Sequence, residues 1–88
     1  DGTRYYIEVK GRIDHGATEF SISTAQVLFA QTQEDRHRLA MVVVSQDGPE
    51  SDELRYVAGA FDHLTPATTT KSLNEYWGDY WERGQNPF

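Results

Sequence analysis

Polar and apolar residues alternate along the first part of the chain, residues 4–10. Because successive side chains of a strand point to opposite faces, this alternation predicts a strand with two unlike faces. One face carries an acid and a base two positions apart, Glu8 and Lys10. The other face is wholly apolar or aromatic: Tyr5, Ile7 and Val9. We therefore expect the apolar face to pack against the core and the charged face to be available for chemistry or for solvent.

A second strand and a helix are predicted next. Glycines at both ends of residues 11–16 indicate a turn, which joins the first strand to a second one over residues 17–22 as an antiparallel hairpin. Ser23 and Gln26 then have the spacing of a capping box, in which each side chain bonds the other residue's backbone N–H. The helix that begins there is expected to run to about Gln33.

The second half of the chain predicts two more strands and a final helix. A continuous apolar run rich in β-branched residues favours a central strand over residues 38–45, buried on both faces. A weaker strand is expected over residues 54–60, and a helix over residues 71–83. The order β-β-α-β-β-α predicts an α/β fold with a small mixed, largely antiparallel sheet of about four strands and two helices.

Composition limits the size and the class of the protein. The chain has 88 residues, which suits one domain over residues 1–88, and 38% of them are hydrophobic, enough for a globular core. It has no cysteine, which excludes a disulfide scaffold and thiolate metal sites. No apolar run approaches the length of a membrane span, and no signal-peptide pattern is present, so we expect a cytoplasmic protein.

The net charge weighs against nucleic-acid binding by the surface as a whole. Fourteen acidic and eight basic residues give a formal charge of −6, and an acidic surface repels phosphate. The bases are nevertheless grouped: Arg4, Lys10 and Arg12 lie near the start, and Arg36 and Arg38 follow the first helix. A local basic face is therefore compatible with the composition.

The first three residues, Asp1-Gly2-Thr3, have the character of a turn. No initiating Met is present, and Asp-Gly before an aromatic strand is a sequence typical of hairpins. We interpret the chain as a fragment of a longer protein, in which the first strand has a partner upstream.

These elements, together with one short string, resemble a known family. The chain contains Ile7-Glu8-Val9-Lys10-Gly11, then Phe20-Ser21-Ile22-Ser23 leading into a helix, then the apolar strand at residues 39–44. The pattern is similar to the C-terminal domain of the NO VEIN protein, which recurs in prokaryotic restriction and phage-defence proteins and resembles the PD-(D/E)XK nuclease-like superfamily. The resemblance covers roughly the first half of the chain. It implies a restriction-endonuclease-like fold.

The resemblance also implies roles for three residues. Glu8 matches the acidic member of the (D/E)XK pair, which binds a divalent metal. Lys10 matches the lysine that orients the nucleophilic water or neutralises charge at the phosphate. Gln26 lies where some branches of the superfamily carry a catalytic glutamine. Hydrolysis of a DNA phosphodiester needs a metal that polarises the phosphate and lowers the pKa of water, and carboxylate and water ligands suit Mg²⁺.

One residue of the family pattern is missing. The superfamily requires an aspartate on the strand before Glu8, and Asp1 falls in the expected turn instead. We expect the isolated chain to be catalytically incomplete unless the rest of the parent protein supplies this carboxylate. Without the resemblance, Glu8 and Lys10 are also explained as an ion pair on a solvated strand, and Gln26 as a helix cap.

Two hypotheses of function follow. The first is a nuclease-like domain of a restriction or defence protein, which contacts DNA with the help of other domains of the parent chain. The second is a non-catalytic module that binds protein or nucleic acid and retains the fold. The histidines have no mutual metal-ligand spacing, and we expect His15 and His37 at the surface. Two residues of the final aromatic group are expected in the core, the group being Tyr76, Trp77, Tyr80 and Trp81.

Overall fold

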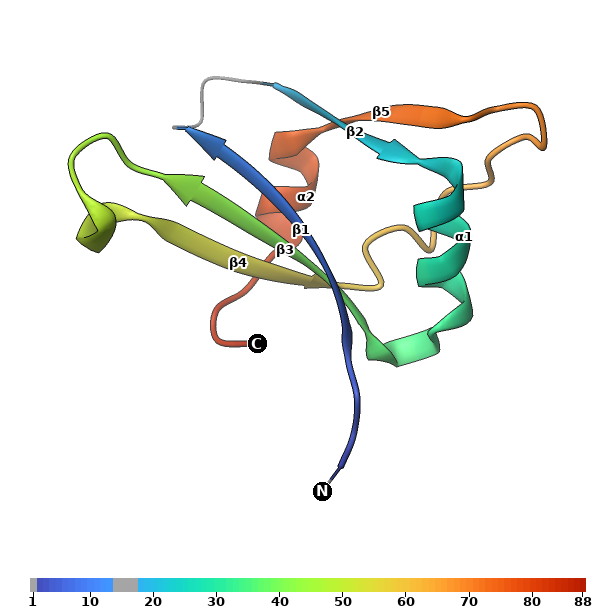
Figure 1. Ribbon diagram of the computed structural model, residues 1–88, viewed down its shortest axis with the longest axis horizontal. Helices are drawn as coiled ribbons and strands as arrows, with labels where there is room; N and C mark the ends of the chain where they lie inside the picture. The colour runs from blue at the N-terminus through green and yellow to red at the C-terminus, as the bar shows by residue number, and fades with distance from the viewer. Residues whose placement is uncertain (1, 14–17) are drawn as a thin grey trace.

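The computed structural model describes residues 2–13 and 18–88, and these form two small β-sheets with two α-helices (Figure 1). The elements are β1 (Tyr6–Ile13), β2 (Glu19–Ser23), α1 (Thr24–Thr32), β3 (His37–Val44), β4 (Glu53–Ala58), β5 (Ser72–Tyr76) and α2 (Trp77–Arg83). Short 3-10 turns precede β3 and β4, at Glu34–Arg36 and Pro49–Ser51. The expected class, a small α/β fold with mixed, largely antiparallel pairing and two helices, is confirmed.

The three-stranded sheet has the order β1-β3-β4. Strand β3 is parallel to β1 and antiparallel to β4. It is the central strand, as expected, and its core side is buried at Leu39, Met41 and Val43. The expected burial on both faces is met only in part, because on the other face Ala40 is buried and Val44 is 44% exposed. The expected hairpin between the first two strands is wrong, because β1 pairs with β3 and β2 belongs to the other sheet. Of the expected turn at residues 11–16, residues 11–13 continue β1, and the remainder lies outside the described residues.

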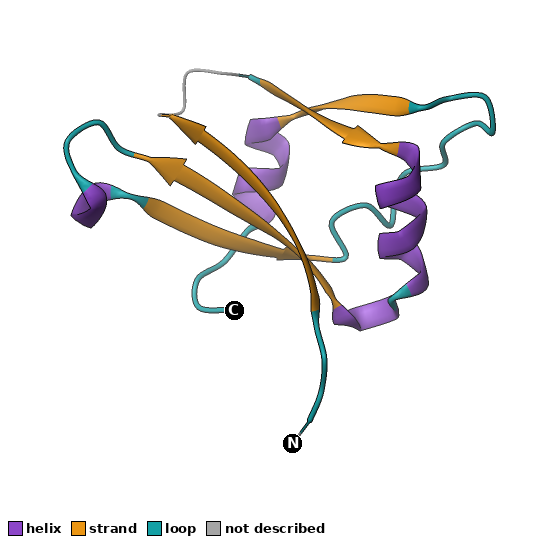
Figure 2. Cartoon of the chain, in the orientation of Figure 1, coloured by secondary structure: helices purple, strands orange, loops and turns teal. Residues whose placement is uncertain are grey.

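The second sheet is an antiparallel pair of β2 and β5, with Glu19 opposite Tyr76 and Ser23 opposite Ser72. Strand β5 corrects the expectation of one helix over residues 71–83, since only Trp77–Arg83 is helical. The backbone N–H and C=O groups of β5 are bonded to β2 across the sheet, so long-range pairing decides its conformation. Figure 2 shows that β2 leads directly into α1 and β5 directly into α2.

A single core joins the two sheets and both helices. The ring of Phe20 from β2 contacts two aromatic rings of α2 edge to face, Trp77 at 6.1 Å and Tyr80 at 5.1 Å between centroids. Trp77 and Tyr80 are thus the two buried members of the final aromatic group, as expected. The other buried apolar residues of the cluster are Ile22, Val27, Ala30, Leu39, Met41, Val43, Val57, Ala60 and Phe61.

Candidate functional site

The register of β1 against β3 determines which of its faces lies inside. Glu8, Lys10 and Arg12 are opposite Leu39, Met41 and Val43, which are buried, so the charged residues share the core side of the sheet. All three are half-buried. The apolar face of β1 points outward, with Ile7 49%, Val9 59% and Ile13 66% exposed. The expectation that the apolar face packs against the core is therefore wrong.

The reversal has a physical cause in the position of β1. A strand at the edge of a sheet is next to solvent along one side, so long charged side chains can lie against the core and still reach water with their ends. The alternation correctly predicted which residues share a face. The alternation could not predict which face would be covered by the rest of the protein. The covering residues come from β2, α1 and α2.

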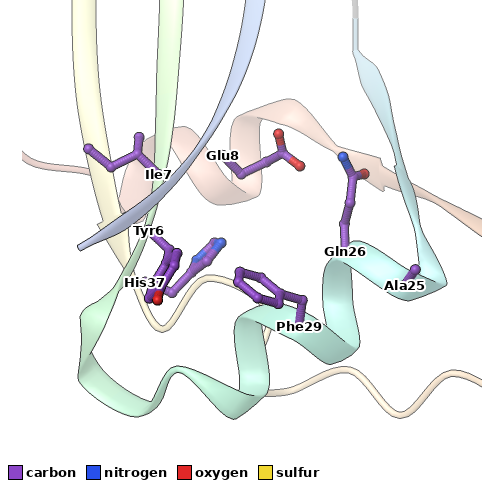
Figure 3. Close-up of a pocket in the computed structure, with 7 residues that line it drawn as sticks. All are labelled: Tyr6, Ile7, Glu8, Ala25, Gln26, Phe29 and His37. Carbon is purple, nitrogen blue, oxygen red and sulfur yellow. The ribbon is translucent and has the colours of Figure 1, made fainter. Parts of the chain in front are cut away.

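A pocket of about 310 Å³ lies between the start of β1 and the N-terminal half of α1 (Figure 3). Glu8 from the strand and Gln26 from the helix both line it, so the structure brings these two candidate residues together. The rings of Tyr6 and Phe29 meet edge to face at 5.2 Å and form an aromatic wall. The remaining lining residues are Ile7, Ala25 and His37.

Gln26 is held in one orientation by the helix cap. Its backbone N–H donates to Ser23 Oγ at 3.0 Å, and its side-chain Oε1 accepts from the Ser23 N–H at 3.0 Å. The expected capping box is thus confirmed. Because Oε1 is used at the cap, the amide nitrogen is the end turned toward Glu8 in Figure 3. Gln26 can cap the helix and also act in the pocket, because the cap uses the amide oxygen and leaves the amide nitrogen for the pocket.

His37 is a pocket residue that the sequence analysis placed at the surface. It is only 4% exposed, because it begins β3 on the core side of the sheet. Burial lowers the pKa of His37, an effect opposed by the nearby charges of Glu8 and Asp62. Its Nδ1 is buried, and no partner for it is found among residues 2–13 and 18–88. Burial thus favours the neutral form of this imidazole, which lines the pocket (Figure 3).

The sequence feature that could have predicted the burial of His37 is the alternation of buried side chains along β3. His37, Leu39, Met41 and Val43 alternate along β3 and all are buried. Extending the alternation of the apolar run by one position would have placed the histidine inside. The charged residues Glu34, Asp35 and Arg36 just before it favoured the surface interpretation.

Lys10 and Arg12 continue the same face of β1 beyond the pocket. The guanidinium carbon of Arg12 lies 4.8 Å from the ring centre of Trp77, a cation–π arrangement. Arg12 Nε and Trp77 Nε1 are both buried, and the part of the chain that the structure describes provides no acceptor for either. Lys10 is not a lining residue of the pocket, although it is on the same side of the strand as Glu8.

The pocket offers few side chains that could bind a metal ion. Within residues 2–13 and 18–88, no cluster of three or more His, Cys, Asp or Glu side chains could hold a metal ion. Asp1, the acid discussed above, lies outside the described residues. Mg²⁺ commonly binds through one or two carboxylates, several waters and substrate phosphates. Glu8 alone meets the lower limit of that pattern, so a bound substrate or a further carboxylate is needed for useful affinity.

A second polar cluster, away from the pocket, is structural. The hydroxyl of buried Tyr80 donates to Glu75 Oε1 at 2.6 Å and lies 3.3 Å from His63 Nε2. Burial, and then the hydrogen bond to Glu75, raise the pKa of Tyr80 far above its usual range. These bonds satisfy a phenol at the edge of the core. The remaining histidine, His15, lies outside the described residues.

Comparison with known proteins identifies a family. Residues 1–57 match the family model described as Protein NO VEIN, C-terminal, which is more than half of the chain. No curated protein and no solved structure matches the chain significantly. Among the described residues, no helix is long and apolar enough to cross a membrane.

Proposed function

The chain belongs to the NO VEIN C-terminal family, and from this premise we propose that it is a nuclease-like domain that hydrolyses phosphodiesters of DNA. The observation that supports the proposal is the pairing of Glu8 and Gln26 in one pocket, with Lys10 next along the same half-buried face. In this reaction a water oxygen bonds to phosphorus, the bond to one ester oxygen breaks, and that oxygen takes up a proton. The family description places such domains at the C-terminal part of a larger protein.

Glu8 is the proposed metal ligand. Its carboxylate is fixed on a strand and borders the pocket, where a hard cation and a phosphate oxygen could meet. When bound, Mg²⁺ supplies polarisation of the phosphate and a water of lowered pKa. The second carboxylate of the superfamily pattern is proposed to come from elsewhere in the parent protein, and the isolated chain is then inactive or nearly so.

Lys10 is proposed to neutralise charge on the phosphate, and Gln26 is proposed to position a water or a phosphate oxygen. Lys10 lies two residues beyond Glu8 on the same face, about 7 Å along the strand. An ammonium at that distance can stabilise the charge that develops on the phosphate. The amide nitrogen of Gln26, turned toward Glu8, can donate to a water or to a phosphate oxygen (Figure 3). His37 also lines this pocket, and burial lowers its pKa, which favours the neutral form.

The test is metal-dependent cleavage of DNA by the full-length parent protein. We expect Glu8→Gln and Lys10→Met each to lower the rate by about 100-fold or more, because each removes charge stabilisation of the transition state. Val9→Thr is the matched control, since Val9 lies between the two residues and its side chain is on the opposite face. Equal rates for the wild type and all three variants would contradict the proposal, as would undiminished cleavage in EDTA.

The exposed apolar face of β1 favours a second candidate function, a module that docks other parts of a protein. Ile7, Val9 and Ile13 form an uncovered apolar row on an edge strand, where both backbone pairing and apolar contact are open to a partner. This candidate does not require chemistry at Glu8. A preserved partner complex and an unchanged cellular function in the Glu8→Gln variant would favour it over the nuclease.

A further inference from the structure

Along the inward face of β1, the chemical character of the side chains changes from aromatic to acidic to basic. Tyr6 is followed at intervals of two residues by Glu8, Lys10 and Arg12, so an aromatic ring, an acid and two bases lie in a row. From Tyr6 to Arg12 the row is about 20 Å long. That is the length of about six stacked nucleotides at roughly 3.4 Å each. The row therefore has the dimensions of a short nucleic-acid segment.

The aromatic end of the row can accept a base. Tyr6 and Phe29 are 41% and 48% exposed and stand at the pocket beside Glu8 (Figure 3). The pocket volume of about 310 Å³ admits one nucleobase with part of its sugar. Aromatic side chains stack on bases with little sequence preference. A base inside a duplex is already stacked and paired, so it must leave the helix before it can enter such a pocket.

The basic end of the row carries two donors that lack an acceptor. Arg12 Nε and Trp77 Nε1 are both buried, the Arg12 guanidinium lies over the Trp77 ring, and Trp77 as a whole is 2% exposed. A buried donor without an acceptor is costly, and a water, an ion, a ligand or stored strain can account for one in a native structure. Among ligand oxygens, guanidinium prefers those of phosphate and carboxylate. Across the sheet on this side, β4 carries Glu53 opposite Val43 and Arg55 opposite Met41.

From these two ends we infer that the substrate of this face is a single-stranded nucleic acid. One base stacks at Tyr6 and Phe29, the backbone passes Glu8 and Lys10, and a phosphate is bound by Arg12 beside Trp77. The inference rests on the proposed nuclease function and names its substrate class. Because the net charge of the chain is −6, we expect binding that depends on these few contacts, with a salt dependence proportional to the small number of phosphates that they neutralise.

Binding without metal tests the inference separately from catalysis. The full chain is titrated in EDTA into a labelled 12-nucleotide single strand and into the matching duplex, and anisotropy is measured. We expect the single strand to bind more tightly. Phe29→Ala should weaken its binding by about fivefold to 150-fold, the range for loss of one stacked base. The control is Leu28→Ala, which removes a neighbouring exposed side chain of α1 outside the pocket and should leave the affinity unchanged.

The phosphate contact is tested by its dependence on salt and by fluorescence. Arg12→Gln should reduce the slope of log affinity against log salt by about 0.7, the value for one phosphate contact in a single strand. Lys71→Gln removes one charge at an exposed position outside the row and should preserve the slope. Trp77 emission should change when the oligonucleotide binds, and Trp77→Phe should abolish that change while Trp81→Phe retains it.

The inference would be overturned by equal affinity for duplex and single strand, by no effect of Phe29→Ala, or by an Arg12→Gln slope equal to that of wild type. The last result would mean that water alone satisfies Arg12 and Trp77. Binding of a peptide in preference to the oligonucleotide would also overturn it. If single-strand binding behaves as expected but Glu8→Gln leaves cleavage unchanged, the nuclease proposal alone fails. If Glu8→Gln abolishes cleavage but duplex and single strand bind equally, only the substrate class is wrong.

Discussion

The two faces of β1 differ in the opposite sense from the two faces of an ordinary surface strand. Its charged face lies toward the core and its apolar face lies toward solvent. An arrangement of this kind leaves charged groups partly desolvated and apolar groups exposed, and both are unfavourable. Features that reduce stability in this way are expected where a protein binds something. This contrast is the basis of the two proposals, ligand chemistry for the inner face and contact with another surface for the outer one.

The largest expected effect comes from the residue that supports the inner face. Leu39 is fully buried opposite Glu8, so Leu39→Ala removes packing under the charged row and leaves a cavity. We expect the free energy of unfolding, measured in urea, to fall by about 2–5 kcal/mol. A loss below about 1 kcal/mol would show that the core side of β1 is loosely packed and would remove the contrast between the faces.

Acidification should destabilise the protein through His37. Burial lowers the pKa of this imidazole in the folded state, so the folded protein binds fewer protons there than the unfolded chain, in which the pKa is 6.5. The stabilisation is complete above that pH and is lost as the pH falls from 6.5 through the lower folded-state pKa. The loss from one group reaches at most about 1.4 kcal/mol per pH unit. Urea unfolding at pH 7.5 and 5.5 measures it.

The matched variant for this prediction is His37→Gln, which keeps a polar side chain but cannot titrate. Stability of this variant should depend less on pH than that of wild type over the same interval. The same dependence in both proteins would mean that His37 is solvated in solution, in conflict with its burial at the start of β3.

Arg12→Met should separate binding from stability. The variant loses a cation–π contact with Trp77, worth about 0.5–1 kcal/mol, but also removes a buried charged donor that costs about 1–3 kcal/mol. We expect the unliganded protein to gain roughly 1 kcal/mol of stability by urea unfolding while its affinity for a single strand falls. A clear loss of stability instead would mark Arg12 as a structural residue.

The smallest effect is expected on the outer face. Val9→Thr places a hydroxyl on a side chain that is 59% exposed, so the free energy of unfolding should change by less than about 0.5 kcal/mol. A cost above about 1 kcal/mol would show that the outer face is covered in solution. Analytical ultracentrifugation of the same sample would then reveal whether a second copy of the chain covers it.

Local patterns predicted much of the structure where the cause is local. The capping box at Ser23 and Gln26 and the central strand expected over residues 38–45 depend on adjacent residues, and both are confirmed. Strand β5 was missed because Leu73, Tyr76 and Tyr80 also have helical spacing, and only the pairing with β2 distinguishes the alternatives. The predicted partner strand of β1 was wrong for the same reason. Its pairing with β3 is non-local, and no property of residues 6–13 specifies it.

The residues of the candidate site also fall into two groups, those suggested by local sequence and those brought together only by the fold. Glu8 and Gln26 were suggested by a family-like string and a helix start, and the structure places both at one pocket. His37 and Phe29 were not suggested as site residues, since they reach the pocket through the arrangement of α1 and β3. Their catalytic or binding roles stay predictions for the experiments above.

The pairing of β2 with β5 has a consequence for how the molecule is made. Strand β2 is synthesised before α1, β3 and β4, but its only partner strand among the described residues comes after them. Phe20 and Ile22, buried in the folded protein, therefore lack this partner while those elements are synthesised. Long-range pairing of this kind slows folding and prolongs the exposure of apolar side chains. Newly made chains are accordingly expected to need chaperone protection until β5 has emerged.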